Sequence, residues 1–386
     1  MKNRLWACAL TALIGCGDDA VEPVQDTTAD VAVAADEGSV LDEGAGEDVV
    51  VPPEVFGVGY RLMKTTYTPK GLDEARTINL SVWYPTRDTT GLPTTYQGIL
   101  PRETVYTDAV PAEGGNWPVM VFSHGNASMA EQNFYLTEHL ATRGWLVVAP
   151  WHTGNTFTDG KVQLTTDHFL VRPQDLTAGL DALEALPADD GLSGRVSDQV
   201  VVAGHSYGGH TALAWAGGTY AGCDPARGSI CNGITETKAA VLAAGLGDPR
   251  VQLAITMSAG NYADLPDVSS VDVPVMFMSG ALDIAVTDVD NGDPYWASLD
   301  GPDDVRINFT TAGHQTFSIA CKFLGSLEEG DGCEGDQFMD PDEGYAAITT
   351  YAEAFIDFHL FGDADAAPIV RGETEVHPDV IVSLKP

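Results

Sequence analysis

Basic residues are scarce in this chain of 386 residues. Lys and Arg total 19 against 56 Asp and Glu, which gives a formal net charge of −37. Such a charge repels phosphate backbones, so nucleic acid is excluded as a partner. Long hydrophobic runs are also missing, because no apolar stretch approaches the roughly 20 residues that a membrane-spanning helix needs. Hydrophobic residues nevertheless make up 44% of the chain, enough to bury a sizeable core.

Cysteines are few, and four of the six lie in the body of the chain, at Cys223, Cys231, Cys321 and Cys333. An even number in an exported protein predicts two disulfides, which have three possible connectivities. We expect pairing of nearest neighbours, Cys223–Cys231 and Cys321–Cys333. Neither pair has the spacing of about two to four residues that is typical of zinc ligands, so a metal is not expected.

The first 16 residues have the features of an export signal. Lys2 and Arg4 precede an apolar stretch that ends in Leu13-Ile14-Gly15-Cys16, which resembles the lipobox of bacterial lipoproteins. The sequence therefore predicts that residues 1–16 form a lipoprotein signal peptide and that Cys16 carries the lipid. The alternative is an ordinary signal peptide that is cleaved nearby.

An acidic segment follows the signal. Residues 17–54 hold 12 acidic and no basic residues, a composition that predicts a disordered tether. The remaining residues, 55–386, contain no internal repeat and are expected to form one catalytic domain, not two. We expect the protein in the cell envelope, held at the outer membrane or cell surface by the lipid alone, as a monomer. Gly17 in place of Asp after the cysteine favours the outer membrane.

Strand and helix patterns alternate along the catalytic domain. Two alternating segments at 56–65 and 76–84 predict an antiparallel opening pair, and later apolar runs predict buried strands. Those runs are 117–123, 146–149, 199–203, 251–257, 274–278 and 305–309. Helical patterns lie between them, one expected to start at Pro173. This order predicts an α/β fold, a mostly parallel central sheet with helices on both faces, and the short link at 258–273 leaves no room for a large cap domain.

The chemistry is indicated by Gly204-His205-Ser206-Tyr207-Gly208-Gly209. This G-x-S-x-G pattern directly follows a predicted buried strand and directly precedes a predicted helix, which is the context of a nucleophile elbow. Ser206 is therefore the candidate nucleophile, and His205 is expected to pack beneath the turn.

A serine nucleophile requires a histidine base and an acid that orients it. His314 follows the last predicted parallel strand, and Asp283 follows the strand before it, which matches the order Ser, acid, His of this motif. Asp288, Asp290 and Asp293 are the alternative acids.

The remaining parts are an oxyanion hole and a substrate pocket. Backbone amides of Tyr207 and Asn126 are the expected oxyanion donors, with Gly125 as the alternative to Asn126. Gly125, Trp151 and His152 are candidates for contact with substrate, although packing within a loop is the more common role for such a histidine.

Together these segments resemble the α/β-hydrolase superfamily. The resemblance is carried by VFSHGNAS, GWLVVAP, RPQDLTAGLDAL, VVAGHSYGGHTAL, VPVMFMSGALD and AGHQTF. It is most similar to the branch that contains platelet-activating factor acetylhydrolases and the predicted dienelactone hydrolases of bacteria. Dienelactone hydrolases use a cysteine nucleophile, so Ser206 argues against that substrate. Acetylhydrolases usually have Leu where this chain has Asn126, so its acyl pocket is expected to differ.

The resemblance implies the α/β-hydrolase fold and a serine esterase that acts through an acyl-enzyme on small or lipid esters, with short acyl chains preferred, and without a cofactor. Two alternatives stay open. One is a cutinase-like polyester hydrolase, which an apolar rim of Phe157, Phe169 and Trp296 would serve. The other is a catalytically idle surface lipoprotein that binds a partner.

Overall fold

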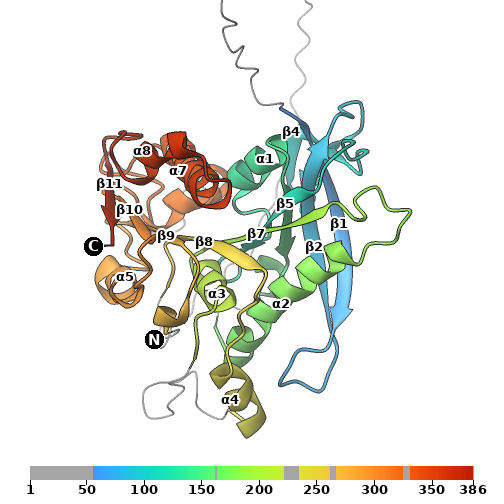
Figure 1. Cartoon of the computed structure of the whole chain (residues 1–386), viewed down its shortest axis with the longest axis horizontal. Helices are drawn as coiled ribbons and strands as arrows, with labels where there is room; N and C mark the ends of the chain where they lie inside the picture. The colour runs from blue at the N-terminus through green and yellow to red at the C-terminus, as the bar shows by residue number, and fades with distance from the viewer. Residues whose placement is uncertain (1–54, 161–162, 221–233, 261–266, 325–330, 386) are drawn as a thin grey trace, which may run out of the picture. The chain divides into compact units, whose positions relative to one another are not determined.

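Eleven strands form one sheet at the centre of the structure (Figure 1). This computed structural model describes residues 55–160, 163–220, 234–260, 267–324 and 331–385. The predicted signal peptide with Cys16 and the predicted tether lie outside the described residues. The strands are β1 (Gly57–Tyr67), β2 (Arg76–Thr86), β3 (Pro93–Tyr96), β4 (Leu100–Thr107), β5 (Trp117–Ser123), β6 (Leu146–Pro150), β7 (Val196–His205), β8 (Val251–Met257), β9 (Val275–Gly280), β10 (Val305–Phe309) and β11 (Val380–Leu384).

Most of the sheet is parallel, as the alternation of strands and helices predicted. Its order is β11-β10-β9-β8-β7-β5-β6-β2-β1-β4-β3, and the six strands from β10 to β6 are parallel to one another. β1 and β2 form the expected antiparallel pair, and β2 joins β6 in antiparallel register. The carboxyl ends of the parallel strands therefore meet at one edge of the sheet, where ligands of open α/β sheets bind.

Helices cover both faces of this sheet. Figure 1 shows α1 (Phe134–Thr142), α7 (Pro341–Leu360) and α8 (Ala367–Val370) on one side of strands β7–β9, and α2 (Thr166–Glu184), α3 (Tyr207–Trp215) and α5 (Asp293–Ser298) on the other. Successive strand residues serve the two sides in turn. In β5, Met120 and Phe122 pack with the first set of helices, and Val119 and Val121 with the second. Each fully buried side chain of this kind contributes about 1.5–3 kcal/mol.

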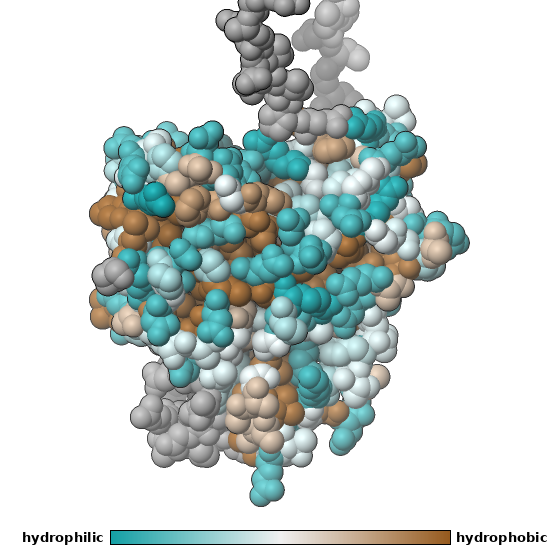
Figure 2. Space-filling view, in the orientation of Figure 1, coloured by the Kyte–Doolittle hydropathy of each residue, from teal (hydrophilic) through white to brown (hydrophobic). Residues whose placement is uncertain are grey.

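The surface reflects this layering. Figure 2 shows hydrophobic residues in a band at the level of strands β7–β10 and hydrophilic residues scattered over the elements around it. No helix among the described residues is long and apolar enough to cross a membrane.

The structure corrects one helix start. Helix α2 begins at Thr166, and Pro173 lies inside it. The backbone N–H of Thr165 donates to Nδ1 of His168, which caps the helix a full turn and more before the proline. The early turns also bury Phe169 and Leu170 in a cluster with Tyr207, and this packing offsets the cost of an interior proline.

Among the described residues, two connections between strands hold the remaining two α-helices, and a third holds only a short turn. The described part of the link between β8 and β9 contains only the short turn Val268–Ser270, which agrees with the absence of a large cap there. The segment after α3 contains α4 (Glu236–Ala243). Cys223 and Cys231, which we expect to be bridged, lie outside the described residues. Helix α6 (Ala320–Leu324) lies in the segment that follows β10.

Candidate active site

Ser206 occupies a sharp turn between β7 and α3. Its φ of 56° lies in the left-handed region, which a non-glycine residue adopts only where the surroundings enforce it. The flanking glycines are required sterically. A Cβ on Gly204 would lie 2.2 Å from the carbonyl oxygen of Gly208, and a Cβ on Gly208 would lie 1.8 Å from that of Ser123. The turn thus presents the serine at the carboxyl edge of the sheet.

The structure brings Ser206, His314 and Asp283 together, although they are separated by up to 108 positions in the sequence. Oγ of Ser206 lies 3.0 Å from Nε2 of His314, and Nδ1 of His314 lies 2.7 Å from Oδ2 of Asp283. Because an ionised carboxylate only accepts hydrogen bonds, Nδ1 carries the proton and Nε2 is free to accept the serine proton. This order of donors and acceptors is that of a nucleophile, a base and an orienting acid.

Asp283 is held in an ionised state by its contacts. Its Oδ1 accepts from the backbone amides of Ala285 (2.8 Å) and Val286 (2.7 Å). Burial on its own would raise the pKa of Asp283, but the hydrogen bonds from His314, Ser258 and the Val286 amide together lower it below its usual value. The carboxylate is therefore charged at neutral pH.

Ser258 is a member of the site that the sequence did not indicate. It follows β8, adopts a φ of 47°, and donates its hydroxyl hydrogen to Oδ2 of Asp283. Its Oγ also lies 3.3 Å from Nδ1 of His314. The only sequence signal is its place at the end of a parallel strand, one that many residues share.

The alternative acids lie elsewhere. Asp288 and Asp293 pair with Arg306, at 2.9 and 2.8 Å, and Asp290 contacts the hydroxyl of Thr287. Among the described residues, none of the three forms a hydrogen bond with His314, whereas Asp283 does.

His205 fixes the backbone of His314. Burial and the neighbouring His314 lower the pKa of His205 to about 3, so its ring is neutral. Nε2 lies 3.1 Å from the carbonyl oxygen of His314, to which it must donate, and Nδ1 accepts from Nε2 of Gln132 at 2.6 Å. The His205 ring therefore does more than the expected packing, because its hydrogen bonds hold the backbone of His314 in place.

Hydrogen bonds fix the backbone of the loop after β5 on both sides of Gly125. The Gly125 N–H donates to Oε1 of Gln132 (2.8 Å), so it is already engaged, which disfavours Gly125 as an oxyanion donor. Nδ1 of His124 lies 2.7 Å from the Gly125 carbonyl oxygen. In a trans peptide the C=O and N–H point in opposite directions, so this contact also sets the direction of the Asn126 N–H. Asn126 and Tyr207 stay predicted oxyanion donors.

A cavity of about 440 Å³ opens beside Ser206. Its walls come from the loop after β5, the loop after β9 and the segment after β10. They comprise Ile99, Gly125, Asn126, Ala127, Ser128, Met129, Gln132, Phe157, His205, Ser206, Ala285, Val286, His314, Gln315, Ser318, Ile319 and Ala320. Gly125 lines the cavity, and its contact with substrate stays a prediction. Ile99 and Phe157 are about half exposed at its mouth, at 50% and 44%.

Trp151 and His152 do not line this cavity, contrary to the expectation for substrate contacts. Trp151 lines a separate hollow and donates from Nε1 to Oγ of Ser81 at 2.8 Å. His152 is fully buried, and its pKa is lowered to about 3 by burial and by the nearby Arg172. The strand before them ends at Pro150, and His152 then contacts Asp175 on α2, which sequence spacing alone does not show.

His152 instead belongs to a buried chain of hydrogen bonds. Nε2 of His152 lies 3.0 Å from Oγ of Ser123, and Nδ1 lies 2.9 Å from Oδ2 of Asp175. Asp175 is also held by Arg76, whose Nε lies 2.7 Å from Oδ1. The order Ser–His–Asp repeats that of the site beside the cavity, but the three side chains of this buried chain have zero exposure, so no substrate reaches them.

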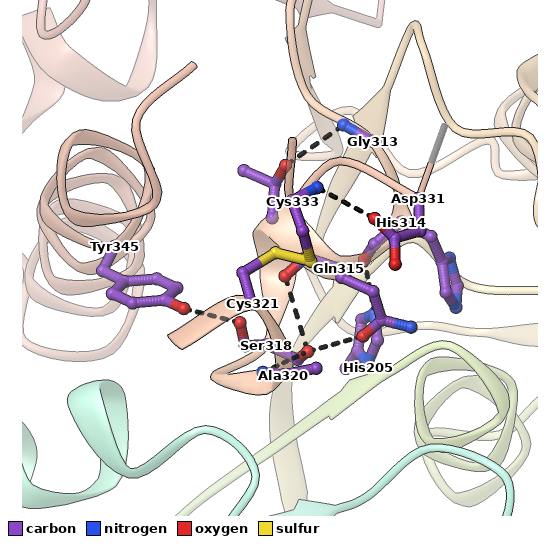
Figure 3. The surroundings of a disulfide bond; sticks show 11 residues. His205, Gly313, His314, Gln315, Ser318, Ala320, Cys321, Asp331, Cys333 and Tyr345 are labelled. Carbon is purple, nitrogen blue, oxygen red and sulfur yellow. Dashed lines mark hydrogen bonds between the residues drawn. A yellow bond between two sulfur atoms is a disulfide. The ribbon is translucent and has the colours of Figure 1, made fainter. Parts of the chain in front are cut away.

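A disulfide lies beside the segment that carries His314 (Figure 3). Cys321 and Cys333 are bonded, which confirms one of the two expected pairs. Next to the bridge, the carbonyl oxygen of Asp331 accepts from the Gln315 N–H at 2.7 Å, and its Oδ1 accepts from the Cys333 N–H at 2.9 Å. The bridge therefore holds the segment 331–333 in contact with the turn that begins at His314.

Removing this bridge is expected to loosen the turn. The double change Cys321→Ser with Cys333→Ser should lower the free energy of unfolding by about 3 kcal/mol, because the bridge closes a loop with a sequence separation of 12. Calorimetry measures the loss, and hydrogen exchange should increase at the Gln315 amide. The double variant avoids the ambiguity of a reductant, which would also reach other cysteines. Wild-type melting and exchange in the variant would contradict this role.

The family model for chlorophyllase matches residues 95–224, about a third of the chain, which includes Ser206 but neither Asp283 nor His314. The solved structure of a ferulic acid esterase from Streptomyces cinnamoneus is similar over 88% of this chain and 99% of its own, with a TM-score of 0.64 and 19% sequence identity. No curated protein matches the chain in sequence.

Proposed function

Because the chain has the α/β-hydrolase fold, we propose that it is a serine hydrolase of carboxylic esters. The observation that carries the proposal is the hydrogen-bonded chain from Ser206 through His314 to Asp283 at a cavity wall. A structural neighbour that is an esterase favours esters as the substrate. The first test is hydrolysis of p-nitrophenyl acetate by the purified protein together with its inactivation by a fluorophosphonate. A protein that does neither is not a serine esterase.

The proposed reaction proceeds through an acyl-enzyme. His314 removes the proton from Ser206 as Oγ forms a bond to the ester carbonyl carbon, and Asp283 stabilises the imidazolium. The backbone amides of Tyr207 and Asn126 hold the oxyanion. When the intermediate collapses, the C–O bond to the alcohol breaks and His314 gives the alcohol its proton. Water then attacks the acyl group with the same histidine as base, and Ser206 is released.

The lining of the cavity favours uncharged substrates. Among the described residues that form its walls there is no Asp, Glu, Lys or Arg. A carboxylate or phosphate on the substrate would therefore find no cation there, and the large negative charge of the protein disfavours its approach. We propose neutral esters with short acyl groups.

Short acyl chains are expected to react best. A cavity of about 440 Å³ that is open to solvent gives a long chain little surface to bury, so the roughly 0.8 kcal/mol per methylene is gained for only a few carbons. A series of p-nitrophenyl esters should therefore show kcat/KM highest from acetate to butyrate and lower by octanoate. A steady rise to palmitate, with activation at a lipid interface, would contradict this expectation.

A polyester hydrolase is the second candidate, favoured by one observation. Ile99 and Phe157 are exposed at the mouth of the cavity and offer an apolar rim to a polymer surface. The rim is smaller than expected, because Phe169 is buried in the cluster around Tyr207 and Trp296 packs near Lys385. Release of soluble products from polyester film distinguishes this candidate. The idle binding protein is disfavoured, since binding alone does not need the aligned Ser206, His314 and Asp283.

We also propose that the protein is a monomer without a cofactor.

We further propose that the protein is a lipoprotein of the cell envelope, and the lipobox-like sequence that ends at Cys16 supports this proposal. Cys16→Ser should abolish lipid attachment and move the protein from the membrane to the soluble fraction, since the predicted anchor is then lost. Metabolic labelling with a fatty acid and fractionation measure both effects. A wild-type protein that takes up no lipid would rule out this anchor.

A further inference from the structure

Arg172 is a completely buried cation close to the proposed active site. It lies on α2 and has zero exposure. A guanidinium does not lose its proton in proteins, and an arginine buried away from water is costly unless its donors are well satisfied. Its contacts therefore show what the charge is used for.

The guanidinium holds the loop that follows β5. Nη2 donates to the carbonyl oxygen of His124 and, at 3.1 Å, to Oγ of Ser123. Nη1 donates to Oδ1 of Asn155 at 2.7 Å, and Nδ2 of Asn155 donates to Oδ1 of Asn126 at 2.8 Å. Both the backbone before Asn126 and the Asn126 side chain are thus fixed by one arginine, directly or through Asn155.

The same guanidinium contacts the residue after the nucleophile. Its Cζ lies 4.5 Å from the centre of the Tyr207 ring, in the geometry of a cation–π contact. Tyr207 is buried and contributes the second proposed oxyanion amide. Arg172 therefore contacts the residues on both sides of the proposed oxyanion hole, which come from two different strand ends.

We infer that Arg172 is a positioning residue of the oxyanion hole, an inference that rests on the proposed esterase function. It holds the Asn126 and Tyr207 amides at a fixed separation before substrate arrives, and its buried charge favours a developing negative oxygen. Its side chain has zero exposure and does not line the cavity, so it acts without contact with the substrate.

The buried Ser123–His152–Asp175 chain fixes the arginine in turn. Oγ of Ser123 accepts a hydrogen bond from Arg172 and donates its hydroxyl hydrogen to Nε2 of the neutral His152. The Nδ1–H of His152 in turn donates to Asp175. The pKa of Asp175 is lowered to about 2, since the hydrogen bonds of His152 and Arg76 outweigh the effect of burial. This second Ser–His–Asp arrangement is therefore a support for the loop and not a second nucleophilic site.

Three variants and a matched control test the inference. Arg172→Met removes the charge and the donors, and Arg172→Lys keeps the charge. Asn155→Asp keeps the acceptor for Arg172 but cannot donate to Asn126. The control is Arg195→Met. Arg195 also donates to loop carbonyls, those of Ala112 and Gly114, and lies over an aromatic ring, that of Trp117, but at the opposite end of β5.

The decisive comparison is between ground-state and transition-state binding. For each variant, kcat and KM are measured with p-nitrophenyl butyrate, and affinity is measured for a trifluoromethyl ketone, which forms a tetrahedral oxyanion when Ser206 adds to it. We expect Arg172→Met to lower kcat/KM by about 10²-fold, almost entirely in kcat, with an equal loss of ketone affinity. Asn155→Asp should lower kcat and the ketone affinity by about tenfold each. Arg172→Lys should recover part of what Arg172→Met loses.

The outcomes separate this inference from the proposed function. A wild-type protein that neither hydrolyses esters nor binds the ketone overturns both. An active wild-type protein whose folded Asn155→Asp variant keeps its kcat and ketone affinity overturns only the role of Arg172, even if Arg172→Met does not fold. The same holds if the Arg195→Met control loses as much kcat as Arg172→Met at equal loss of melting temperature, since the effect would then be one of general stability.

Discussion

Ser206→Ala is expected to lower ester hydrolysis by about 10³-fold or more while the protein stays folded. The hydroxyl oxygen that lies 3.0 Å from Nε2 of His314 is lost, and alanine offers no atom that could form the acyl-enzyme. The substitution adds no bulk to the turn at φ 56°, so the strained backbone and the contacts of Gly204 and Gly208 are unchanged. Initial rates with p-nitrophenyl butyrate and circular dichroism measure the two effects.

Ser128→Ala is a suitable control for this change. Ser128 lines the same cavity and, within the part of the chain that the structure describes, has no hydrogen bond to His314 or Asp283. Its hydrolysis rate should therefore stay close to that of the wild-type protein. If Ser206→Ala kept most of the activity, or if both serine variants lost it equally, the assignment of Ser206 as the nucleophile would fail.

Asp283→Asn is expected to lower kcat by about 10⁴-fold at neutral pH, with little effect on folding. The carboxylate forces the proton onto Nδ1 of His314, 2.7 Å away. An amide at position 283 can donate to Nδ1 instead, which favours the tautomer with a proton on Nε2. That proton would face Ser206 and prevent the histidine from acting as its base. Steady-state rates at several pH values measure the loss.

Two comparisons sharpen this expectation. Asp290→Asn makes the same chemical change on an exposed side chain that contacts Thr287. The kcat of this variant should therefore match that of the wild-type protein. Ser258→Ala removes one of the contacts to Oδ2 of Asp283 and should cost about tenfold at most. An Asp283→Asn variant with kcat close to the wild-type value would show that another group orients His314.

The sequence was sufficient for the parts of the site that depend on local chain geometry. The turn at Ser206 needs glycines at fixed positions between a strand and a helix, and the sequence shows these glycines directly. Asp283 and His314 follow consecutive parallel strands, so their predicted meeting at the carboxyl edge needed only the topology. The α/β-hydrolase fold expected from these segments is confirmed, whereas the resemblance to the acetylhydrolase branch stays a prediction.

The parts that the sequence did not indicate depend on contacts between distant segments. His152 lies near a strand end, as pocket residues do, but its position is decided by Asp175 and Ser123, which come from other elements. Arg172 has no local pattern that separates it from a surface arginine on an amphipathic helix. Ser258 is similar, because its role depends on the carboxylate that reaches it from another loop.

Strands at the sheet edges were also missed for a physical reason. β3 has only four residues, and most residues of β4 and β11 are exposed or only partly buried, without a regular alternation. Pairing with a neighbour supplies the hydrogen bonds that define them, as in the antiparallel register of β10 with β11. A strand formed mainly by its partner leaves little periodic signal in its own sequence.

The most direct test of this account is to locate the covalent adduct of a fluorophosphonate by peptide mass spectrometry. The full-length protein is inactivated with the probe, digested and mapped. We predict one modified residue, Ser206 in the segment Gly204-His205-Ser206-Tyr207-Gly208, with adduct formation in proportion to the loss of ester hydrolysis. An adduct at a different serine, or full inactivation without any adduct at Ser206, would contradict it.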